Sequence, residues 1–430
     1  MRSPVRAFAL ALLGAISASL SSAQSVKTLT LQQAEQLAVQ NHPMIQAASN
    51  LASAANAQVT EARSAYYPTV YGSLTGVGAE NSSRIAAGGL NNPIIYDRYA
   101  NGVTVSQLVT DFGRTHELVK STDLHAQAQR EGVVATRAEV LLQVDQSYFA
   151  ALKAQSVLAV AEETVKARQL VSDQVTELAK NKIRSDLDFN FANVNLAQAQ
   201  LLLIQAQNDL RSAFARLEEA LGSSDQDTFQ LADQPMPPPP PSDVSILIQQ
   251  ALKDRPELVG QRFQVDSAQS YTTAERDLKL PTISALGTAG LTPINESPLA
   301  PRYAAGGFNV NIPIFNGHLY GARETEAASR ALAENQYLRN LQNQIVRDVQ
   351  TAWHDANAGY QRLSVTDRLL AEANQALDLA HGRYDLGLSS IIELTQAELN
   401  QTTARIDQAS AKYDYEAQYS LLNYQLGALH

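Results

Sequence analysis

The chain has 430 residues, no cysteine and a formal net charge of −10 at pH 7. The lack of cysteine excludes disulfide scaffolds, thiolate metal sites, cysteine nucleophiles and a lipid anchor on an N-terminal cysteine. The acidic balance argues against a nucleic-acid partner.

The first residues have the composition of a secretory signal peptide. Arg2 and Arg6 give a basic start, an apolar stretch runs from Phe8 to Ile16, and Ser21-Ser22-Ala23 is a small-residue cleavage site. We therefore predict a signal peptide at residues 1–23 and an exported mature chain. No later segment approaches the roughly 18 apolar residues that a membrane-spanning helix requires.

The mature chain repeats itself. Three landmarks of the first half recur in the second, the first two after 213 residues and the third after 205: Pro43 as Pro256, Pro68 as Pro281, and Gly222 as Gly427. Such a constant separation indicates duplication of a unit much longer than a solenoid repeat of about 20–50 residues. We predict two structural repeats, residues 24–222 and 243–430, joined by a Pro-rich surface linker at 223–242.

Each repeat is predicted to begin with two helices. Thr30 and Gln33 form a capping-box pattern at the first helix, and Asp243 is the expected cap in the second repeat. A longer helix, rich in Ala and Gln, then runs from about Met44 to Tyr66.

Alternating apolar and polar residues follow in both repeats and predict β-hairpins at about 67–110 and 281–315. Their Asn-, Gly- and Pro-rich connections lie at 81–98 and 291–302. We therefore predict four strands per chain: Val70–Leu74, Gly102–Ser106, Thr282–Leu286 and Phe308–Ile314.

A very long helix is predicted after each hairpin. Gly113 and Gly317 mark strand-to-helix corners, where glycine permits the bend. From Arg114 to Lys180 there is no proline, and a helix of that length measures on the order of 100 Å. The helical pattern breaks at 181–185, and in the second repeat at 384–390, before a returning helix.

The returning helix of the first repeat carries apolar residues at threes and fours, which predicts a helix-packing seam. Its members are Leu187, Phe191, Val194, Leu201 and Ile204. Alanines lie off this seam and suit close neighbours on more than one side: Ala192, Ala199, Ala206 and Ala213.

These elements indicate assembly of several chains. Four strands cannot close a barrel, and helices near 100 Å long have no globular core to pack against. If chains pool their strands, the resulting closed barrel can span an outer membrane, because all its backbone groups are paired. The predicted fold class is mainly α with β, with long antiparallel helical hairpins.

Four segments together resemble the TolC family of outer-membrane efflux proteins. They are LTLQQAEQLAVQNHP at 29–43, VSQLVTDFGR at 105–114, NIPIFNGHLYG at 311–321, and RYDLGLSSIIELTQAELNQ at 383–401. The resemblance covers essentially the whole mature chain, and the absence of Cys separates it from the family's lipidated members.

The resemblance implies a homotrimer embedded in outer-membrane lipid, with a twelve-stranded barrel continuous with a periplasmic α-helical barrel. It implies a passive exit duct for efflux or type I secretion. The implied partners are a periplasmic adaptor and an inner-membrane pump of the RND or ABC type.

In the family, the helix breaks are tips that close the channel and dock the adaptor. The second tip keeps the family pattern of a glycine, a small residue and an acid, whereas the first tip has no glycine and is basic. The pattern residues are Gly387, Ser390 and Glu393, and their counterparts in the first repeat are Lys182, Ser185 and Asp188.

We predict that Asp188 and Glu393 contribute carboxylates to a constriction at the periplasmic mouth, where rings of like charge favour cations. The alternative is that both acids only complement a helix macrodipole. By resemblance, Tyr384 is a hydrogen-bond partner in the closed mouth. Position 389, which holds Arg in some family members, is Ser389, so the lock must differ.

The predicted adaptor-docking residues lie in both tips: Lys182, Arg184, Ser185, Gly387, Leu388, Ser389 and Ser390. A second interpretation of Gly387 is that it supplies a left-handed turn, which is compatible with docking.

Other functional classes fit the sequence less well. The seven histidines show no metal-ligand spacing, and HExxH and GxSxG elements are absent. We therefore expect no enzyme, cofactor or metal. A soluble periplasmic coiled-coil scaffold would leave the strands unexplained, and a monomeric pore would need more strands. Tyr148 and Trp353 occupy equivalent positions and are expected to be packing residues.

Overall fold

The computed structural model describes residues 27–80, 96–223, 229–295 and 299–429. The predicted signal peptide at 1–23 and most of the first strand connection, 81–95, lie outside the described residues. The described chain is mainly helical with a small sheet, so the predicted fold class is confirmed.

The helices repeat in length as well as in order. Each helix of the first repeat has a counterpart of equal length in the second, with 11, 21, 67 and 35 residues in turn. The pairs are α1 (Leu31–Asn41) and α5 (Val244–Asp254), α2 (Pro43–Arg63) and α6 (Pro256–Arg276), α3 (Arg114–Lys180) and α7 (Leu319–Asp385), and α4 (Asp186–Ala220) and α8 (Ile391–Gln425).

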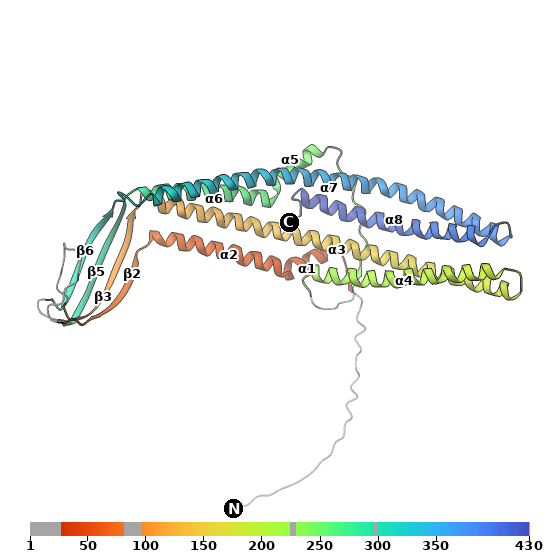
Figure 1. Ribbon diagram of the computed structural model, residues 1–430, viewed down its shortest axis with the longest axis horizontal. Helices are drawn as coiled ribbons and strands as arrows, with labels where there is room; N and C mark the ends of the chain where they lie inside the picture. Colours follow the sequence, from red (N-terminus) through yellow and green to blue (C-terminus); the bar gives the residue numbers. More distant parts are fainter. Residues whose placement is uncertain (1–26, 81–95, 224–228, 296–298, 430) are drawn as a thin grey trace, which may run out of the picture.

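The long helices form two antiparallel hairpins that lie side by side along the molecule, with the sheet at one end and both tips at the other (Figure 1). α3 starts and ends at the residues that the sequence predicts. The capping box of Thr30 and Gln33 is also present.

Four of the five members of the predicted packing seam of α4 face away from the chain, whereas Phe191 is partly buried and packs against a cluster that includes Leu394 on α8. The alanines at every seventh position are buried: Ala192, Ala199, Ala206 and Ala213. Leu187, Val194 and Leu201, by contrast, are 60%, 52% and 67% exposed. Small side chains let α3 and α4 approach closely, which leaves the larger apolar residues on the outer side.

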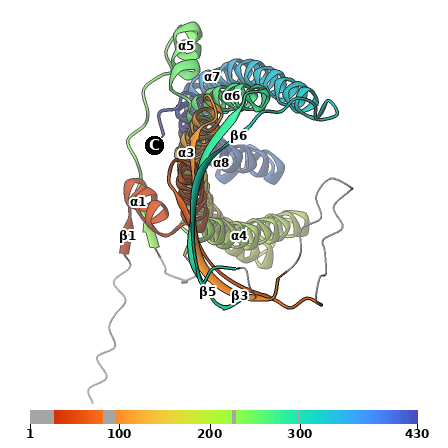
Figure 2. The same ribbon diagram turned by 90° about the vertical axis from the view of Figure 1, so that its left-hand side faces the viewer.

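Four strands form one antiparallel sheet in the order β2-β3-β5-β6. They are β2 (Thr69–Val77), β3 (Arg98–Thr110), β5 (Thr282–Asn295) and β6 (Arg302–Asn311). The β3–β5 pairing joins the two repeats, and the sheet is strongly curved (Figure 2).

Several predicted strand ends are wrong. β2 and β3 extend beyond the predicted Val70–Leu74 and Gly102–Ser106, and β6 begins at Arg302 and not at Phe308. β5 continues to Asn295, into the segment expected to be a loop. β6 ends at Asn311 and does not reach Ile314. Pro313 has no N–H to donate to a strand ladder, which accounts for the early end of β6.

A second, two-stranded parallel sheet was not predicted. It pairs β1 (Lys27–Leu29) with β4 (Phe229–Leu231), and β4 lies inside the segment assigned as linker. Three-residue strands are too short to show alternation. The Tyr148 hydroxyl on α3 lies 2.8 Å from the carbonyl oxygen of Leu29 and 2.6 Å from that of Ala232, and so ties both strands to the long helix.

The Pro-rich segment that follows β4 is also held by side chains. Tyr415 on α8 donates a hydrogen bond to the carbonyl oxygen of Pro238 at 2.6 Å. Trp353 on α7 donates from Nε1 to the carbonyl oxygen of Pro241 at 2.7 Å. Tyr148 and Trp353 thus act at equivalent positions, as anchors for the connection between the repeats.

Both repeats use the same close contact where the returning helix ends. Gly222 and Gly427 have left-handed φ angles of 69° and 73°. A Cβ on Gly222 would lie 2.8 Å from the Cα of His42, and one on Gly427 would lie 3.0 Å from the carbonyl carbon of Asp254. Only glycine can adopt the left-handed φ and also leave room for this close backbone contact.

No helix in the described part of the chain is both long enough and apolar enough to cross a membrane.

Candidate functional site

The two helix-hairpin tips share one backbone geometry. In the first, Ile183 N–H donates to Leu178 at 2.9 Å, and in the second, Leu388 N–H donates to Arg383 at 2.8 Å. Both are the long hydrogen bond of a Schellman motif, which needs a left-handed residue. Lys182 and Gly387 provide it, with φ of 57° and 71°.

The helices that leave the tips are capped differently. Ser185 caps α4, because its hydroxyl accepts from Asp188 N–H at 3.1 Å and Asp188 Oδ2 accepts from Ser185 N–H at 3.2 Å. Ser390 makes no side-chain cap at the start of α8. There, Glu393 Oε1 instead pairs with Arg383 Nε at 3.0 Å, with both side chains about half exposed.

One side chain joins the two tips. Arg184 Nη2 donates to the carbonyl oxygen of Tyr384 at 2.7 Å, and its guanidinium lies over the Tyr384 ring, 4.1 Å from the centroid. Such a cation–π contact is worth about 0.5–2 kcal/mol. Arg184 therefore binds the first hairpin to the last turn of α7 in the second.

Tyr384 itself is buried. Burial raises the pKa of its hydroxyl above the ordinary value, and that hydroxyl has no hydrogen-bond partner among the described residues. The contact with Arg184 is made by the ring and the carbonyl oxygen instead. Tyr384 also packs in a small apolar cluster with Ala380, Ile391 and Leu394.

A polar layer crosses both hairpins behind the tips. Arg168 on α3 and Glu398 on α8 form a buried ion pair, and burial lowers the pKa of Arg168 to about 10. Asn195 on α4 donates to the Thr395 hydroxyl on α8 at 2.8 Å. The sequence did not suggest this layer, because its partners belong to different repeats and no spacing links them.

A group of buried acids lies further from the tips. Burial and the neighbouring Glu35 raise the pKa of Asp145 to about 8, and burial also raises the pKa of Glu35. Burial raises the pKa of Glu416 on α8 to about 7. Asp145 and Glu416 are 2% and 1% exposed, so both carboxyls resist ionisation.

Comparison with known proteins identifies the fold and its setting. A family model described as Outer membrane efflux protein matches residues 34–223 and 247–428, once per repeat. The chain belongs to this family. Membership places the efflux protein in the outer membrane, with its helical part in the periplasm, as an exit duct for efflux or secretion.

Individual relatives of this efflux protein are distant but extensive. Outer membrane protein TolC of Vibrio cholerae is 24% identical over 406 residues, which cover 91% of this chain and 89% of that protein. Outer membrane protein TolC of Escherichia coli is 21% identical over 355 residues, which cover 77% and 72%. A membrane protein structure from Pseudomonas aeruginosa has a TM-score of 0.82 at 21% identity and covers 92% and 93%. The resemblance to the TolC family is thereby confirmed.

Of the predicted site residues in the efflux protein, Arg184 and Tyr384 meet directly. Asp188 and Glu393 occupy equivalent positions, and each has a local partner in the chain. Gly113 and Gly317 have φ of 113° and 62° at the strand-to-helix corners.

The remaining tip residues differ in exposure. Gly387 and Leu388 are exposed, whereas the Ser389 hydroxyl is buried without a hydrogen-bond partner among the described residues. Ile183, the counterpart of Leu388, was not singled out from the sequence, yet the two are 67% and 66% exposed. Only the equivalence of the two tips could have identified Ile183.

Proposed function

We propose that three copies of the chain form one duct, with pooled strands in the outer membrane and pooled helical hairpins in the periplasm. The duct takes cargo from an inner-membrane pump through a periplasmic adaptor. The main support is the outward-facing apolar stripe of α4 together with the open edges of the sheet.

The stripe has the spacing of a helix-packing surface. Leu187, Val194 and Leu201 recur every seven residues and are all more than half exposed. Seven-residue spacing of large apolar residues is the pattern that packs against another helix. A second copy of the chain offers helices of the same length, so the stripe fits a neighbouring subunit.

The sheet supports the same proposal. β2 and β6 are its outer strands and have no further partner within the described chain. Unpaired strand edges in a membrane leave backbone groups unsatisfied at several kcal/mol each. Edge-to-edge pairing of three sheets removes every such edge.

The periplasmic tips form the gate in this proposal. Arg184 holds the two tips of one subunit together, and Asp188 and Glu393 add carboxylates near the mouth. Opening requires the tips to separate, which breaks the contact of Arg184 with Tyr384. Ile183 and Leu388 form an exposed apolar pair, one per hairpin, that suits adaptor docking.

The assembly is tested by mass. Outer-membrane protein is extracted in detergent, and its protein mass is measured by light scattering. We expect a trimer for the wild type and for Leu201→Met, and loss of the trimer for Leu201→Lys, which places a charge in the packing surface. A wild-type monomer, or a trimer that tolerates lysine, contradicts the proposal.

The mouth is tested by planar-bilayer recording. Glu393→Gln removes one carboxylate per subunit and is expected to lower the preference for cations. Unchanged selectivity and conductance would remove Glu393 from the gate and leave only its pairing with Arg383.

A further inference from the structure

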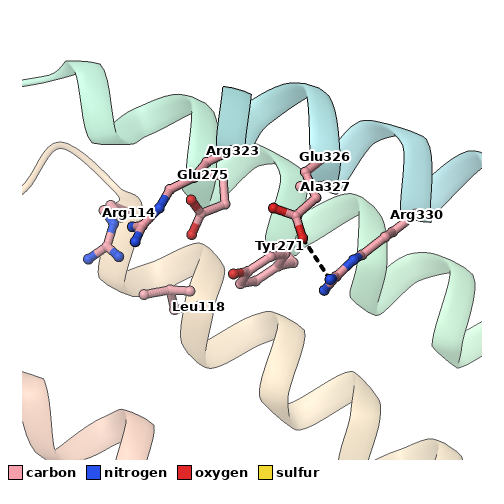
Figure 3. A pocket seen from close by; sticks show the side chains of 8 residues that line it. All are labelled: Arg114, Leu118, Tyr271, Glu275, Arg323, Glu326, Ala327 and Arg330. Carbon is pink, nitrogen blue, oxygen red and sulfur yellow. Dashed lines mark ion pairs between the residues drawn. The ribbon is translucent and has the colours of Figure 1, made fainter. Parts of the chain in front are cut away.

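A polar cavity of about 420 Å³ lies between α3, α6 and α7, close to the end of the helices that meets the sheet. Arg114 is the first residue of α3, and Arg323 lies in the first turns of α7. Tyr271 and Glu275 come from the last turns of α6 (Figure 3). The cavity therefore sits where the membrane-embedded strands give way to periplasmic helices.

One end of the cavity is basic. Arg330 pairs with Glu326 at 2.6 Å, but no carboxylate in the described part of the chain is within ion-pair distance of Arg114 or Arg323. Arg114 Nε is buried without a hydrogen-bond partner there. In Figure 3 the two guanidinium groups point toward the same region. Two unpaired arginines together favour a phosphate or carboxylate, which guanidinium groups bind through paired hydrogen bonds.

A buried carboxylate lies beside these arginines, because Glu275 is placed between Arg323 and Tyr271 in Figure 3. Glu275 is only 4% exposed, and its Oε2 has no hydrogen-bond partner among the described residues. The Tyr271 side chain is its neighbour, and burial together with Glu275 raises the pKa of the Tyr271 hydroxyl. A buried carboxylate oxygen without a partner is costly. A ligand that brings a cationic donor to Glu275 removes this cost.

The duplication shows that the fold does not require these charges. The positions that correspond to Arg114 and Arg323 hold Leu319 and Leu118, and the position that corresponds to Glu275 holds Ala62. The helices of both repeats have the same lengths and order. The charged set is therefore specific to the α3–α6–α7 junction and occurs once per chain.

We propose that this cavity binds the phosphoethanolamine group of an outer-membrane phospholipid. The phosphate contacts Arg114 and Arg323, and the ammonium contacts Glu275. A zwitterion matches two arginines with a carboxylate beside them, whereas a simple anion would meet Glu275 with like charge. In the proposed duct, the junction of strands and helices lies at the depth of the periplasmic head groups.

Native mass spectrometry of the intact protein tests the site. The protein is exchanged into detergent with phosphatidylethanolamine or phosphatidylglycerol of identical acyl chains. We expect at least tenfold tighter binding of phosphatidylethanolamine, and at least a tenfold loss with Arg323→Gln. Arg339→Gln, which removes an exposed arginine of α7 outside the cavity, is the matched control and is expected to bind as the wild type does.

The buried carboxylate is tested by a variant of its own. Glu275→Gln keeps the shape but removes the charge, and is expected to bind the two lipids equally. Wild-type protein that binds both lipids equally, or Arg323→Gln that binds phosphatidylethanolamine normally, overturns the proposal.

Soluble probes distinguish the source of the head group. Binding of the lipid without binding of O-phosphoethanolamine or inorganic phosphate supports a lipid site. Equally tight binding of O-phosphoethanolamine overturns the lipid assignment in favour of a soluble phosphoester. These readouts do not involve conductance, so they are independent of the gating proposal.

Discussion

The two tips have the same backbone and different side chains. Lys182 and Gly387 occupy equivalent positions, and both adopt left-handed φ angles. Asp188 completes a capping box, while its counterpart Glu393 pairs with an arginine across the turn. The duplicated fold dictates the turn, because a helical hairpin must reverse there, but leaves the chemistry of each tip free to differ.

The polar layer behind the tips extends this difference to the helices. Arg168 and Glu398 form a buried ion pair, but their counterparts in the other repeat are Ala373 and Asn193. The ion pair is therefore specific to the contact between α3 and α8, which joins the two hairpins of one chain. The equivalent surfaces of α7 and α4 carry no such charge.

The largest effect is expected from breaking this ion pair. Arg168→Met leaves Glu398 buried without its partner, and the loss of one member of a buried pair costs about 3–5 kcal/mol. We expect a clear fall in the thermal unfolding midpoint. Ala373→Met at the equivalent position is the control, and an equal fall in both variants would show that only packing is affected.

The buried acids give the next largest effect, and it depends on pH. The folded-state pKa of Asp145 is raised, so the folded protein binds more protons than the unfolded chain between about pH 4 and the folded pKa of about 8. The contribution of Asp145 to stability is therefore greatest at low pH and declines as the pH rises through this window.

Asp145→Asn tests this dependence. Each pKa unit corresponds to about 1.4 kcal/mol, so we expect the variant to gain stability relative to the wild type by on the order of a few kcal/mol from pH 4 to pH 8. Glu35 and Glu416 remain titratable, so the stability of the variant still depends on pH to some extent. Unfolding midpoints at several pH values provide the measurement. Asp378→Asn, on the exposed surface of α7, is expected to show no such gain.

The contact between the tips comes next. Arg184→Ala removes a charge-assisted hydrogen bond, worth about 1.5–3 kcal/mol, as well as the cation–π contact. We expect larger single-channel conductance in planar bilayers, because the tips separate more easily. Lys180→Ala removes a neighbouring cation whose ion pair, among the described residues, is with Glu177 of its own helix, and it is expected to leave conductance unchanged. Unaltered conductance in Arg184→Ala would show that the contact of Arg184 with Tyr384 does not hold the mouth closed.

The smallest effect is expected from exchanging the left-handed residues. Gly387→Lys introduces a left-handed lysine, at a cost of about 1–2 kcal/mol. Lys182→Gly relieves the same strain at the first tip, and we expect a stabilisation of about 1 kcal/mol. Opposite shifts in the unfolding midpoint would establish that the two turns are equivalent. Shifts of the same sign would mean that side-chain contacts of Lys182 outweigh its backbone strain.

Local signals in the sequence predicted the long elements well. An uninterrupted run without proline gave both ends of α3, and Thr30 with Gln33 gave the start of α1. The constant separation of the landmarks predicted the duplication, which the matched helix lengths confirm. These features depend on residues that are close in the sequence, or on the separation between matching residues of the two repeats.

Features that depend on tertiary contacts were not predictable. β1 and β4 are three residues each and exist only because each pairs with the other. The apolar spacing of α4 predicted a packing surface, but periodicity could not show that alanines, and not these larger side chains, face α3. Similarly, both tips were recognised, yet the contact of Arg184 with Tyr384 joins residues whose proximity no spacing reveals.

The anchored connection between the repeats also fixes the depth of the tips. Tyr148 and Trp353 bind it from equivalent positions, and each lies 34 residues before the left-handed residue of its own tip. Both tips therefore lie about 50 Å along their helices from the level of this connection. One residue inserted into α3 below Tyr148 would lower a single tip by about 1.5 Å and turn it by about 100°. Arg184 would then face away from Tyr384. The contact between the two tips therefore depends on equal helix lengths between each tip and the connection that Tyr148 and Trp353 hold.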